Sequence, residues 1–419
     1  MSNSTETTSP DKHLISEETR SKHVDWLMGV TQIPTATGCE QRVVAWIDQW
    51  VSGREGVEKR ADPHGNFELS LSSAPKTDHP IYFTAHLDHP AFVVEQIVNE
   101  TELILSFRGG VMSDYFPDAT IRVHTSDEGF VPATIVEEHD PDGKEWSETE
   151  TRPFKMYRAT STASHGASVG DIGTWELPDA QIIDDEFGGI IHTNACDDLA
   201  AVAAALCALD EIRIAQQNGA VKNDVRVLFT LAEEIGFVGA IGASKDGFMP
   251  KGSRIIALEN SRAFHDSPIH GGPIVRVGDR ISVFSPELTG AVAKVAERIA
   301  GGPAQPKASE KMSDMPKWKW QRKLMAGGAC EASVYCAYGY TSTCVCLPLG
   351  NYHNMGGLAE AQAGTHEGVP RVGREYVGID DFHGMVDLLI GCGTDLPKSP
   401  GFIERVEKLW DERKFVIGS

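Results

Sequence analysis

The chain has 419 residues, of which 41% are hydrophobic and 23% are charged, and its formal net charge at pH 7 is −22. This length suits two or three structural units, and the composition is that of an ordinary globular protein, which excludes a disordered or fibrous chain. The acidic balance argues against binding to nucleic acid or to anionic membranes through bulk electrostatics, because both ligands need a basic protein surface.

Neither a membrane span nor a secretory signal is visible in the sequence. The longest uninterrupted apolar run, Leu199 to Leu209, has 11 residues, whereas a membrane-spanning helix needs about 20. The N-terminal residues are polar and contain no apolar core. The cysteines are scattered, and the one close pair, Cys344 and Cys346, lies in an apolar run that is typical of a buried strand. We therefore expect a cytoplasmic protein that binds neither nucleic acid nor membranes.

The N-terminal part of the chain is predicted to contain a tail and two helices. Residues 1–15 are rich in Ser and Thr, which is typical of a disordered tail. A helix is predicted over 16–31, because its apolar residues, Leu27 among them, fall on one stripe. The segment Thr37–Glu40 fits a capping box, with Thr first and Glu three residues later, and it predicts a second helix directly after it.

Four short apolar runs lead directly into polar side chains that could be reactive. Such runs are typical of strands buried on both faces, and helical patterns at 199–212, 286–300 and 331–337 lie between them. The alternation predicts an α/β fold with a mainly parallel sheet centre. Because ligands of such sheets bind beyond the carboxyl ends of the strands, the residues after the runs are the expected site. The four runs are 81–85, 225–231, 254–258 and 343–347.

Residues 95–183 are predicted to form a small all-β domain inserted into the α/β domain. Short β runs bounded by Gly, Pro and Asp turns recur there without a strong helical pattern. The chain then divides into the tail (1–15), an α/β domain made of 16–94 and 184–419, and the inserted domain. The segment 301–323, rich in Pro and Lys, is expected to be a surface loop. The β runs lie at 103–107, 120–124, 131–136 and 172–177.

Histidine and acidic residues stand at the ends of these strands and helices. His86 and Asp88 follow the first run, and residues i and i+2 of a strand point the same way. Asp88 could therefore orient a His86 imidazole that binds a metal ion. Asp197 and Asp198 directly precede a predicted helix, where they could be an ordinary helix cap or a carboxylate that bridges two metal ions.

Glu233 and Glu234 follow the second run without a basic neighbour in the sequence. Two anions at a buried strand end are unfavourable unless a cation neutralises them. One could bind a metal ion while the other acts as general base to a metal-bound water, and solvation at the surface is the alternative. Glu259 and His353 stand after the two remaining runs, and each alone is a weak signal.

The complete set is far more specific than its members. Five strand or helix ends deliver His, Asp, Glu-Glu, Glu and His in chain order. Nitrogen and oxygen ligands without thiolate are typical of zinc, cobalt or manganese in a catalytic site. Five ligands that include one shared carboxylate fit a two-metal centre, in which the ions lie about 3.5–4 Å apart.

The set resembles the ligands of the dinuclear zinc aminopeptidase and carboxypeptidase superfamily. Within it, the chain is most similar to the tetrahedral (TET), glutamyl and deblocking aminopeptidases. This similarity rests on the long insertion between Asp88 and Asp197, on the segment 85–94 and on the glycine-rich segment 271–279. The resemblance implies a phosphorylase/hydrolase-like mixed sheet flanked by helices, an inserted small β-barrel domain and a homo-oligomer.

The resemblance also implies a role for each residue of the site. Glu233 would be the general base, and Asp88 would orient His86. The cofactors would be two divalent metal ions, with zinc as the first expectation and cobalt or manganese as alternatives. The ligands would be His86 and Glu259 for one ion, Glu234 and His353 for the other, and Asp197 as the bridge.

The chain departs from the pattern of the family at four places. Glu259 stands where the branch often has Asp, and Leu199 stands where a basic residue is common. His89–Ala91 replaces the usual acidic residue and glycine after Asp88. The residues around the last histidine, Asn351–Asn354, also differ.

Three functions remain open at this point. The leading prediction is a metal-dependent aminopeptidase that removes N-terminal residues from peptides. A two-metal amidohydrolase or deacylase acting on a small N-acyl compound is the alternative, because the same activated water cleaves any amide. A scaffold protein that has lost catalysis is disfavoured, since every expected ligand type and the base are present.

Overall fold

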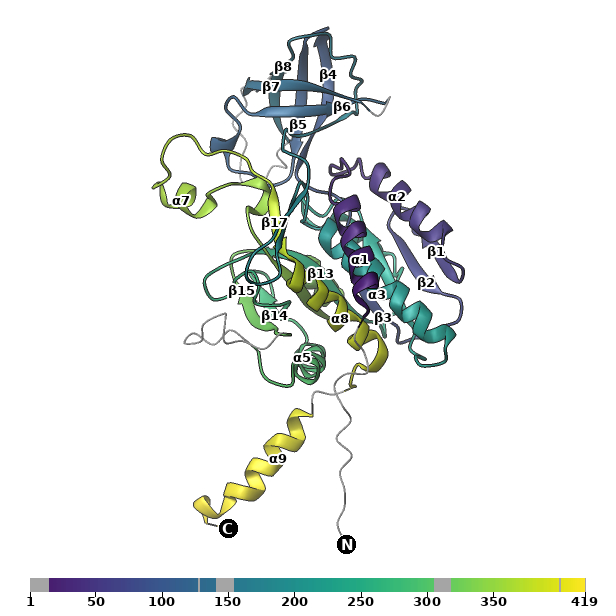
Figure 1. Cartoon of the computed structure of the whole chain (residues 1–419). Coiled ribbons are helices and arrows are strands. Elements are labelled where there is room, and N and C mark those ends of the chain that lie inside the picture. The colour runs from purple at the N-terminus through teal and green to yellow at the C-terminus, as the bar shows by residue number, and fades with distance from the viewer. Residues whose placement is uncertain (1–14, 127–128, 141–153, 305–317, 399–400, 419) are drawn as a thin grey trace.

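The computed structural model of the chain contains a helix-flanked mixed sheet and a closed β-barrel at one end of the molecule (Figure 1). The predicted α/β fold with an inserted barrel is therefore confirmed. Within the described part of the chain, no helix is both long and apolar enough to cross a membrane. The described residues are 15–126, 129–140, 154–304, 318–398 and 401–418.

The main sheet has eight strands, and its centre is parallel. In spatial order the strands are β1 (Val57–Ala61), β2 (Phe67–Leu71), β12 (Val225–Thr230), β3 (Ile81–His86), β13 (Arg254–Arg262), β16 (Thr341–Leu349), β14 (Ile274–Asp279) and β15 (Gln321–Met325). Strands β12, β3, β13 and β16 pair in parallel, whereas β1, β2 and β14 each have an antiparallel neighbour. The carboxyl ends of the four parallel strands therefore meet at one edge of the sheet.

Helices cover both faces of this sheet, as the unbroken apolar character of the central strands requires. One face carries α1 (Glu17–Val30), α2 (Gln41–Ser52), α3 (Leu199–Gln217), α5 (Pro286–Ala300) and α8 (Ile379–Asp395). The other face carries α4 (Val238–Lys245) and α6 (Glu331–Ala337). Helix α3 packs against both the sheet and the helices α1 and α8, so its predicted apolar run is buried all round.

The barrel has six antiparallel strands around an aromatic core. The strands are β4 (Ala91–Asn99), β5 (Glu102–Arg108), β8 (Lys155–Thr160), β7 (Phe130–Glu138), β6 (Thr120–His124) and β9 (Ile172–Trp175), and η2 (Ser113–Tyr115) follows β5. Rings such as Phe92, Phe116 and Trp175 contact one another edge to face inside it. Strand β4 begins only a few residues after β3, so the barrel is joined directly to the edge where the parallel strands end.

A small three-stranded sheet includes two strands that lie, in the sequence, between the barrel and α3. It consists of β10 (Gln181–Ile183), β11 (Ile190–Thr193) and β17 (Glu375–Gly378). Before β17 the chain passes through η4 (Tyr352–Asn354) and α7 (Leu358–Ala363). Strand β17 pairs with β11, which places Glu375 opposite Thr193 and close to the start of α3.

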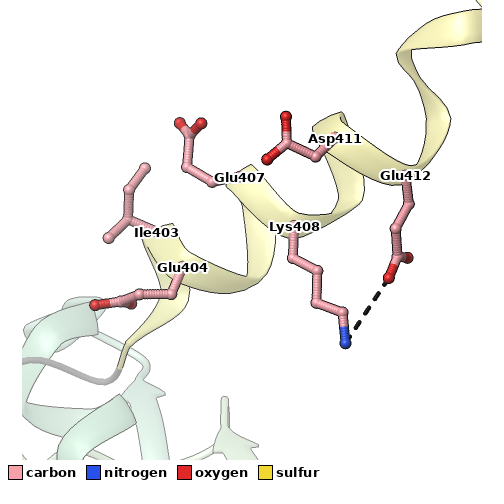
Figure 2. A pocket seen from close by; sticks show the side chains of 6 residues that line it. All are labelled: Ile403, Glu404, Glu407, Lys408, Asp411 and Glu412. Atoms are coloured by element: carbon pink, nitrogen blue, oxygen red, sulfur yellow. Dashed lines mark ion pairs between the residues drawn. The ribbon is translucent and has the colours of Figure 1, made fainter.

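The last helix projects away from the rest of the molecule (Figure 1). It is α9 (Phe402–Arg413), followed by η5 (Lys414–Ile417). Its charged side chains point outward, with Lys408 paired to Glu412 at 3.8 Å (Figure 2). Its apolar residues Ile403, Val406, Leu409 and Trp410 are exposed as well, and none of them belongs to a hydrophobic cluster of the described chain.

The predicted capping box at the start of α2 is wrong. The helix begins at Gln41, and its N-cap, Glu40, makes no capping bond with its side chain. The hydroxyl of Thr37 instead donates to Oδ2 of Asp88 at 2.7 Å, and Oε1 of Glu40 accepts from the backbone N–H of Gly38. A fully buried carboxylate loses more free energy without hydrogen-bond donors than a helix end that water can reach. The Thr37 hydroxyl therefore donates to Asp88 and not to the helix.

Two further element ends differ from the prediction. Strand β13 continues to Arg262, so Glu259 lies within the strand and not at its end, because parallel pairing with β16 continues past it. The predicted surface loop 301–323 overlaps β15, which begins at Gln321. Part of that loop, 305–317, and nearly all of the predicted tail lie outside the described residues.

Candidate metal centre

All seven side chains that the sequence predicts for the site come together at the carboxyl edge of the parallel strands. His86 ends β3, the two glutamates follow β12, Glu259 lies in β13, and Asp197 precedes α3. Three overlapping groups have donor atoms within 4.8 Å of one another and could each hold an ion. They are His86, Asp197, Asp198 and Glu259; His86, Glu233 and Glu234; and Asp197, Glu234 and His353.

The first half of the centre is arranged around His86. Its Nε2 lies 3.5 Å from Oδ1 of Asp197 and 3.8 Å from Oε1 of Glu259. Its Nδ1 lies 3.1 Å from the backbone carbonyl oxygen of Asp88 and 3.4 Å from Oδ1 of the same residue. Asp88 therefore fixes the ring, and Nε2 is left facing the two carboxylates.

The second half of the centre is arranged around His353. Its Nε2 lies 3.3 Å from Oε1 of Glu234 and 3.5 Å from Oδ2 of Asp197. Its Nδ1 lies 2.6 Å from the carbonyl oxygen of Gly110, just beyond barrel strand β5. Asp197 thus presents one carboxylate oxygen to each histidine and stands between the two halves. Its peptide bond to Asp198 is cis.

Asp88 also holds the turn that carries the two glutamates. Its Oδ1 accepts from the backbone N–H of Glu233 at 2.9 Å, and its Oδ2 accepts from that of Glu234 at 3.1 Å. Just before them, Ala232 adopts a φ of 54°. The backbone therefore bends after β12, which lets both side chains reach the same centre, and Oε2 of Glu233 lies 4.0 Å from Nε2 of His86.

The pKa values show how strongly negative this buried centre is. Burial would lower the pKa of His86, but the charge of Glu233 and close contacts with Asp197 and other carboxylates raise it well above its usual range. Burial would raise the pKa of Asp197, but its close contacts with His353 and His86 hold it below its usual value. A group of buried carboxylates of this kind needs compensating positive charge.

Two orphaned oxygens show that a divalent ion fits this site. Oδ1 of Asp197 and Oε1 of Glu234 are buried and have no hydrogen-bond partner within the described chain. Each oxygen lies 3.3–3.5 Å from a histidine nitrogen. In both places an oxygen and a nitrogen that can bind a metal ion therefore face each other. Imidazole nitrogen with carboxylate oxygen is a donor set that suits zinc, manganese or cobalt.

Glu375 is a residue of the site that sequence reasoning missed. It is fully buried in β17, where Oε1 accepts from the backbone N–H of His353 at 2.8 Å. Its Oε2 accepts from the N–H groups of Cys196 and Asp197 at 2.6 and 3.0 Å. Burial, with the charge of Asp197, raises its pKa to about 7. No motif marks it, since it follows His353 by a long segment and lies in a short strand.

Arg276 is the second missed residue. It is only 2% exposed, in β14, and its Nη1 lies 3.4 Å from Oε2 of Glu259 and 3.2 Å from Oγ of Ser261. The two oxygens of Glu259 are therefore divided between His86 on one side and Arg276 on the other. Its signal in the sequence was a lone arginine inside the glycine-rich segment 271–279.

Two positions where the chain departs from the family pattern contact each other. Nε2 of His89 lies 3.0 Å from Oδ1 of Asn354, and its Nδ1 lies 2.5 Å from the carbonyl oxygen of Asp197. The amide nitrogen of Asn354 in turn donates to the carbonyl oxygens of Asn194 and Gly373. His89 and Asn354 thus contact each other, and His89 also contacts the backbone of Asp197.

Comparison with known structures finds the same fold in archaeal aminopeptidases. The TET1 peptidase of Pyrococcus horikoshii, described as able to assemble into a tetrahedron or a large octahedral shell, is 18% identical, with a TM-score of 0.66 over 89% of this chain and 100% of its own. An aminopeptidase of Desulfurococcus kamchatkensis is 17% identical, with a TM-score of 0.67 over 93% and 98%. A TET aminopeptidase of a marine sediment thaumarchaeote is 20% identical, with a TM-score of 0.66 over 92% and 99%.

The family assignment comes from the sequence itself. No curated protein matches the chain significantly. The model of the M42 glutamyl aminopeptidase family, however, matches residues 65–356, a stretch that includes every predicted metal ligand. The resemblance inferred from the ligand set is thereby confirmed. Because the match spans well over half of the sequence, the chain belongs to the M42 glutamyl aminopeptidase family and is a metal-dependent aminopeptidase.

Proposed function

We propose that the chain removes N-terminal residues from peptides at a centre that holds two divalent metal ions, zinc in the first place and cobalt or manganese as alternatives. The observation that carries this proposal is the position of Asp197, whose two oxygens face His86 and His353 at 3.5 Å each. When bound, the ions would polarise the scissile carbonyl and lower the pKa of a water molecule.

The ligands divide into two sets around Asp197. His86 and Glu259 would hold one ion, and Glu234 and His353 would hold the other. The contacts within each half support this division, since Glu259 lies near His86, and Glu234 lies near His353. Asp197 contributes one oxygen to each set, which is the arrangement of a bridging carboxylate.

Glu233 acts as the general base. Its carboxylate takes a proton from the attacking water and later passes it to the leaving amine. Its Oε2 lies farther from Nε2 of His86, at 4.0 Å, than the nearest oxygen of Asp197 or Glu259. Glu233 therefore borders the centre as the most distant of these three carboxylates. Asp88 is the positioning residue, because it holds both the His86 ring and the backbone of Glu233.

A homo-oligomer in the cytoplasm is the second part of the proposal. Support comes from the TET1 peptidase of Pyrococcus horikoshii, which shares the fold over 89% of this chain and is described as able to assemble into a tetrahedron or a large octahedral shell. The acidic net charge of −22 also suits a protein that remains soluble and binds no nucleic acid.

The experiment compares hydrolysis of one peptide set by the zinc- and cobalt-loaded protein. Each peptide is supplied with a free and with an acetylated N-terminus. Cleavage of the free-amine peptides alone is expected. Cleavage of the blocked forms, or of neither form, would contradict the proposal and favour a deacylase acting on small N-acyl compounds.

A variant of the proposed general base, Glu233, tests the mechanism in the same assay. Glu233→Gln should keep the metal content of the wild type and lower turnover about a hundredfold or more, since general-base catalysis typically contributes about 10²–10⁴-fold. Glu404→Gln, a matched change on the exposed surface of α9, should leave turnover unchanged. Wild-type turnover in Glu233→Gln would remove this residue from the mechanism.

A further inference from the structure

The turn after β12 donates four consecutive backbone N–H groups to side chains, and Asp88 accepts the last two. The first two go to other buried residues. The N–H of Leu231 donates to Oδ1 of Asn66 at 3.0 Å. The N–H of Ala232 donates to Oε1 of Glu40, also at 3.0 Å. Three separate parts of the chain therefore hold the turn on which the proposed general base stands.

Glu40 connects this turn to the segment before helix α2. It is 2% exposed, and its Oε1 accepts from the N–H of Gly38 at 2.8 Å as well as from that of Ala232. Its position is electrostatically unfavourable, because burial and the charge of Asp88 raise its pKa. Residues that lower stability are expected where function requires them, and the bond to Ala232 links Glu40 directly to the turn of the base.

Ala232 depends on such a bond because its backbone is strained. Its φ of 54° lies in the left-handed region, which a residue with a Cβ adopts at a cost. Such a conformation persists only where the surrounding structure enforces it. Relaxation of Ala232 would redirect the residues that follow it, and Glu233 is the first of these.

Asn66 anchors both ends of the same turn. It is fully buried directly before β2, and its Oδ1 accepts from Leu231, the first residue after β12. Its Nδ2 donates to the carbonyl oxygen of Gly239 in α4 at 3.1 Å and to Oδ2 of Asp62 at 2.6 Å. One side-chain amide thus joins the end of the strand to the helix that follows the turn.

We propose that Glu40 and Asn66 are positioning residues for the general base Glu233. This proposal rests on the proposed function, in which Glu233 takes a proton from the attacking water. The metal ligands are held by the ions that they bind, whereas the carboxylate of Glu233 depends on the backbone of its turn. A displacement of about 1 Å at a reacting group can cost about a hundredfold in rate.

The test is a double-mutant cycle in the zinc-loaded protein, with kcat and KM measured separately on a free-amine peptide. Glu40→Met removes the acceptor of the Ala232 N–H and should lower kcat about tenfold to a hundredfold, with KM within about twofold. Glu40→Gln keeps Oε1 as an acceptor and should retain kcat within about threefold. In the Glu233→Gln background, Glu40→Met should lower kcat by less than about threefold, because residues that act as a unit are not additive.

A second variant and a control complete the cycle. Asn66→Ala should show the same non-additive loss, and it tests the proposal if Glu40→Met folds poorly. Glu68→Met is the control for a general loss of stability, since Glu68 is buried in β2 and pairs with Arg60 at 2.9 Å. It should lower the melting temperature and leave kcat unchanged.

Hydrogen–deuterium exchange of the zinc-loaded protein gives a readout that does not depend on activity. Peptides that cover residues 230–239 should exchange faster in Glu40→Met and in Asn66→Ala than in the wild type or in Glu68→Met. The reason is that N–H groups of the turn lose their acceptors in the first two variants and not in the control.

The proposal is overturned if Glu40→Met and Asn66→Ala retain the kcat of the wild type. It is also overturned if their losses are equal with Glu and with Gln at position 233. Wild-type turnover in Glu233→Gln would instead contradict the proposed function itself, and this proposal with it, so the two failures are distinguishable.

Discussion

At the scale of single residues, three of the proposed metal ligands each have a dedicated support. Asp88 holds His86, Gly110 holds His353, and Arg276 contacts the oxygen of Glu259 that is turned away from His86. Such supports fix the direction of a ligand before the metal ion binds, which raises affinity and limits exchange. Arg276 is the one arginine that contacts a proposed ligand among the described residues, so its removal is informative.

Arg276→Met should lower the free energy of unfolding of the metal-free protein by about 3–5 kcal/mol, because breaking a buried pair leaves Glu259 as an uncompensated charge. The loss should shrink when zinc is present, since the ion supplies positive charge beside the same carboxylate. Chemical denaturation with and without zinc measures both values. Arg298→Met is the control, because its pair with Asp395 is exposed and should contribute at most about 1 kcal/mol. Equal losses in the two variants would contradict the role of Arg276.

At the scale of elements, one segment joins the metal centre to the barrel. Strand β3 ends at His86, Asp88 and His89 follow, and barrel strand β4 begins at Ala91. The chain leaves β5 at Gly110, whose carbonyl oxygen contacts His353. The segments directly before and after the first barrel hairpin therefore belong to the proposed metal site or contact it, so the barrel helps to position the residues of that site.

Helix α9 takes no part in the link between the metal centre and the barrel. The side chains of Ile403, Val406, Leu409 and Trp410 are exposed, and none of them joins a hydrophobic cluster of the described chain, so they bury little surface against the folded body. Deletion of residues 401–419 should therefore leave the melting temperature within about 2 °C of the wild type, since little apolar area is lost. Differential scanning calorimetry measures it. A fall of about 10 °C or more would show that α9 packs on the body or on another subunit.

At the scale of the whole molecule, the sequence predicts those parts of the fold and site that depend on local pattern. The apolar runs before His86 and Glu233 end where the strands β3 and β12 end, because strands buried on both faces are apolar throughout. The segment Thr37–Glu40 shows the limit of local pattern, since a buried carboxylate distant in sequence took the hydroxyl that a helix cap would use.

The supports of the site could not be predicted in the same way. Glu375 and Arg276 reach the centre through the pairing of β17 with β11 and of β14 with β16. Such pairings bring together residues far apart in the sequence, and nothing in the local pattern around either residue encodes them.

The central claim is that the site around Asp197 holds two metal ions, and metal content per chain tests it most directly. Protein dialysed against zinc and analysed by mass spectrometry of the metals should contain two ions per chain. His353→Ala and Glu259→Gln should each contain one, because each removes a ligand of a different ion. A single ion per chain in the wild type, or two in the His353→Ala variant, would contradict the account.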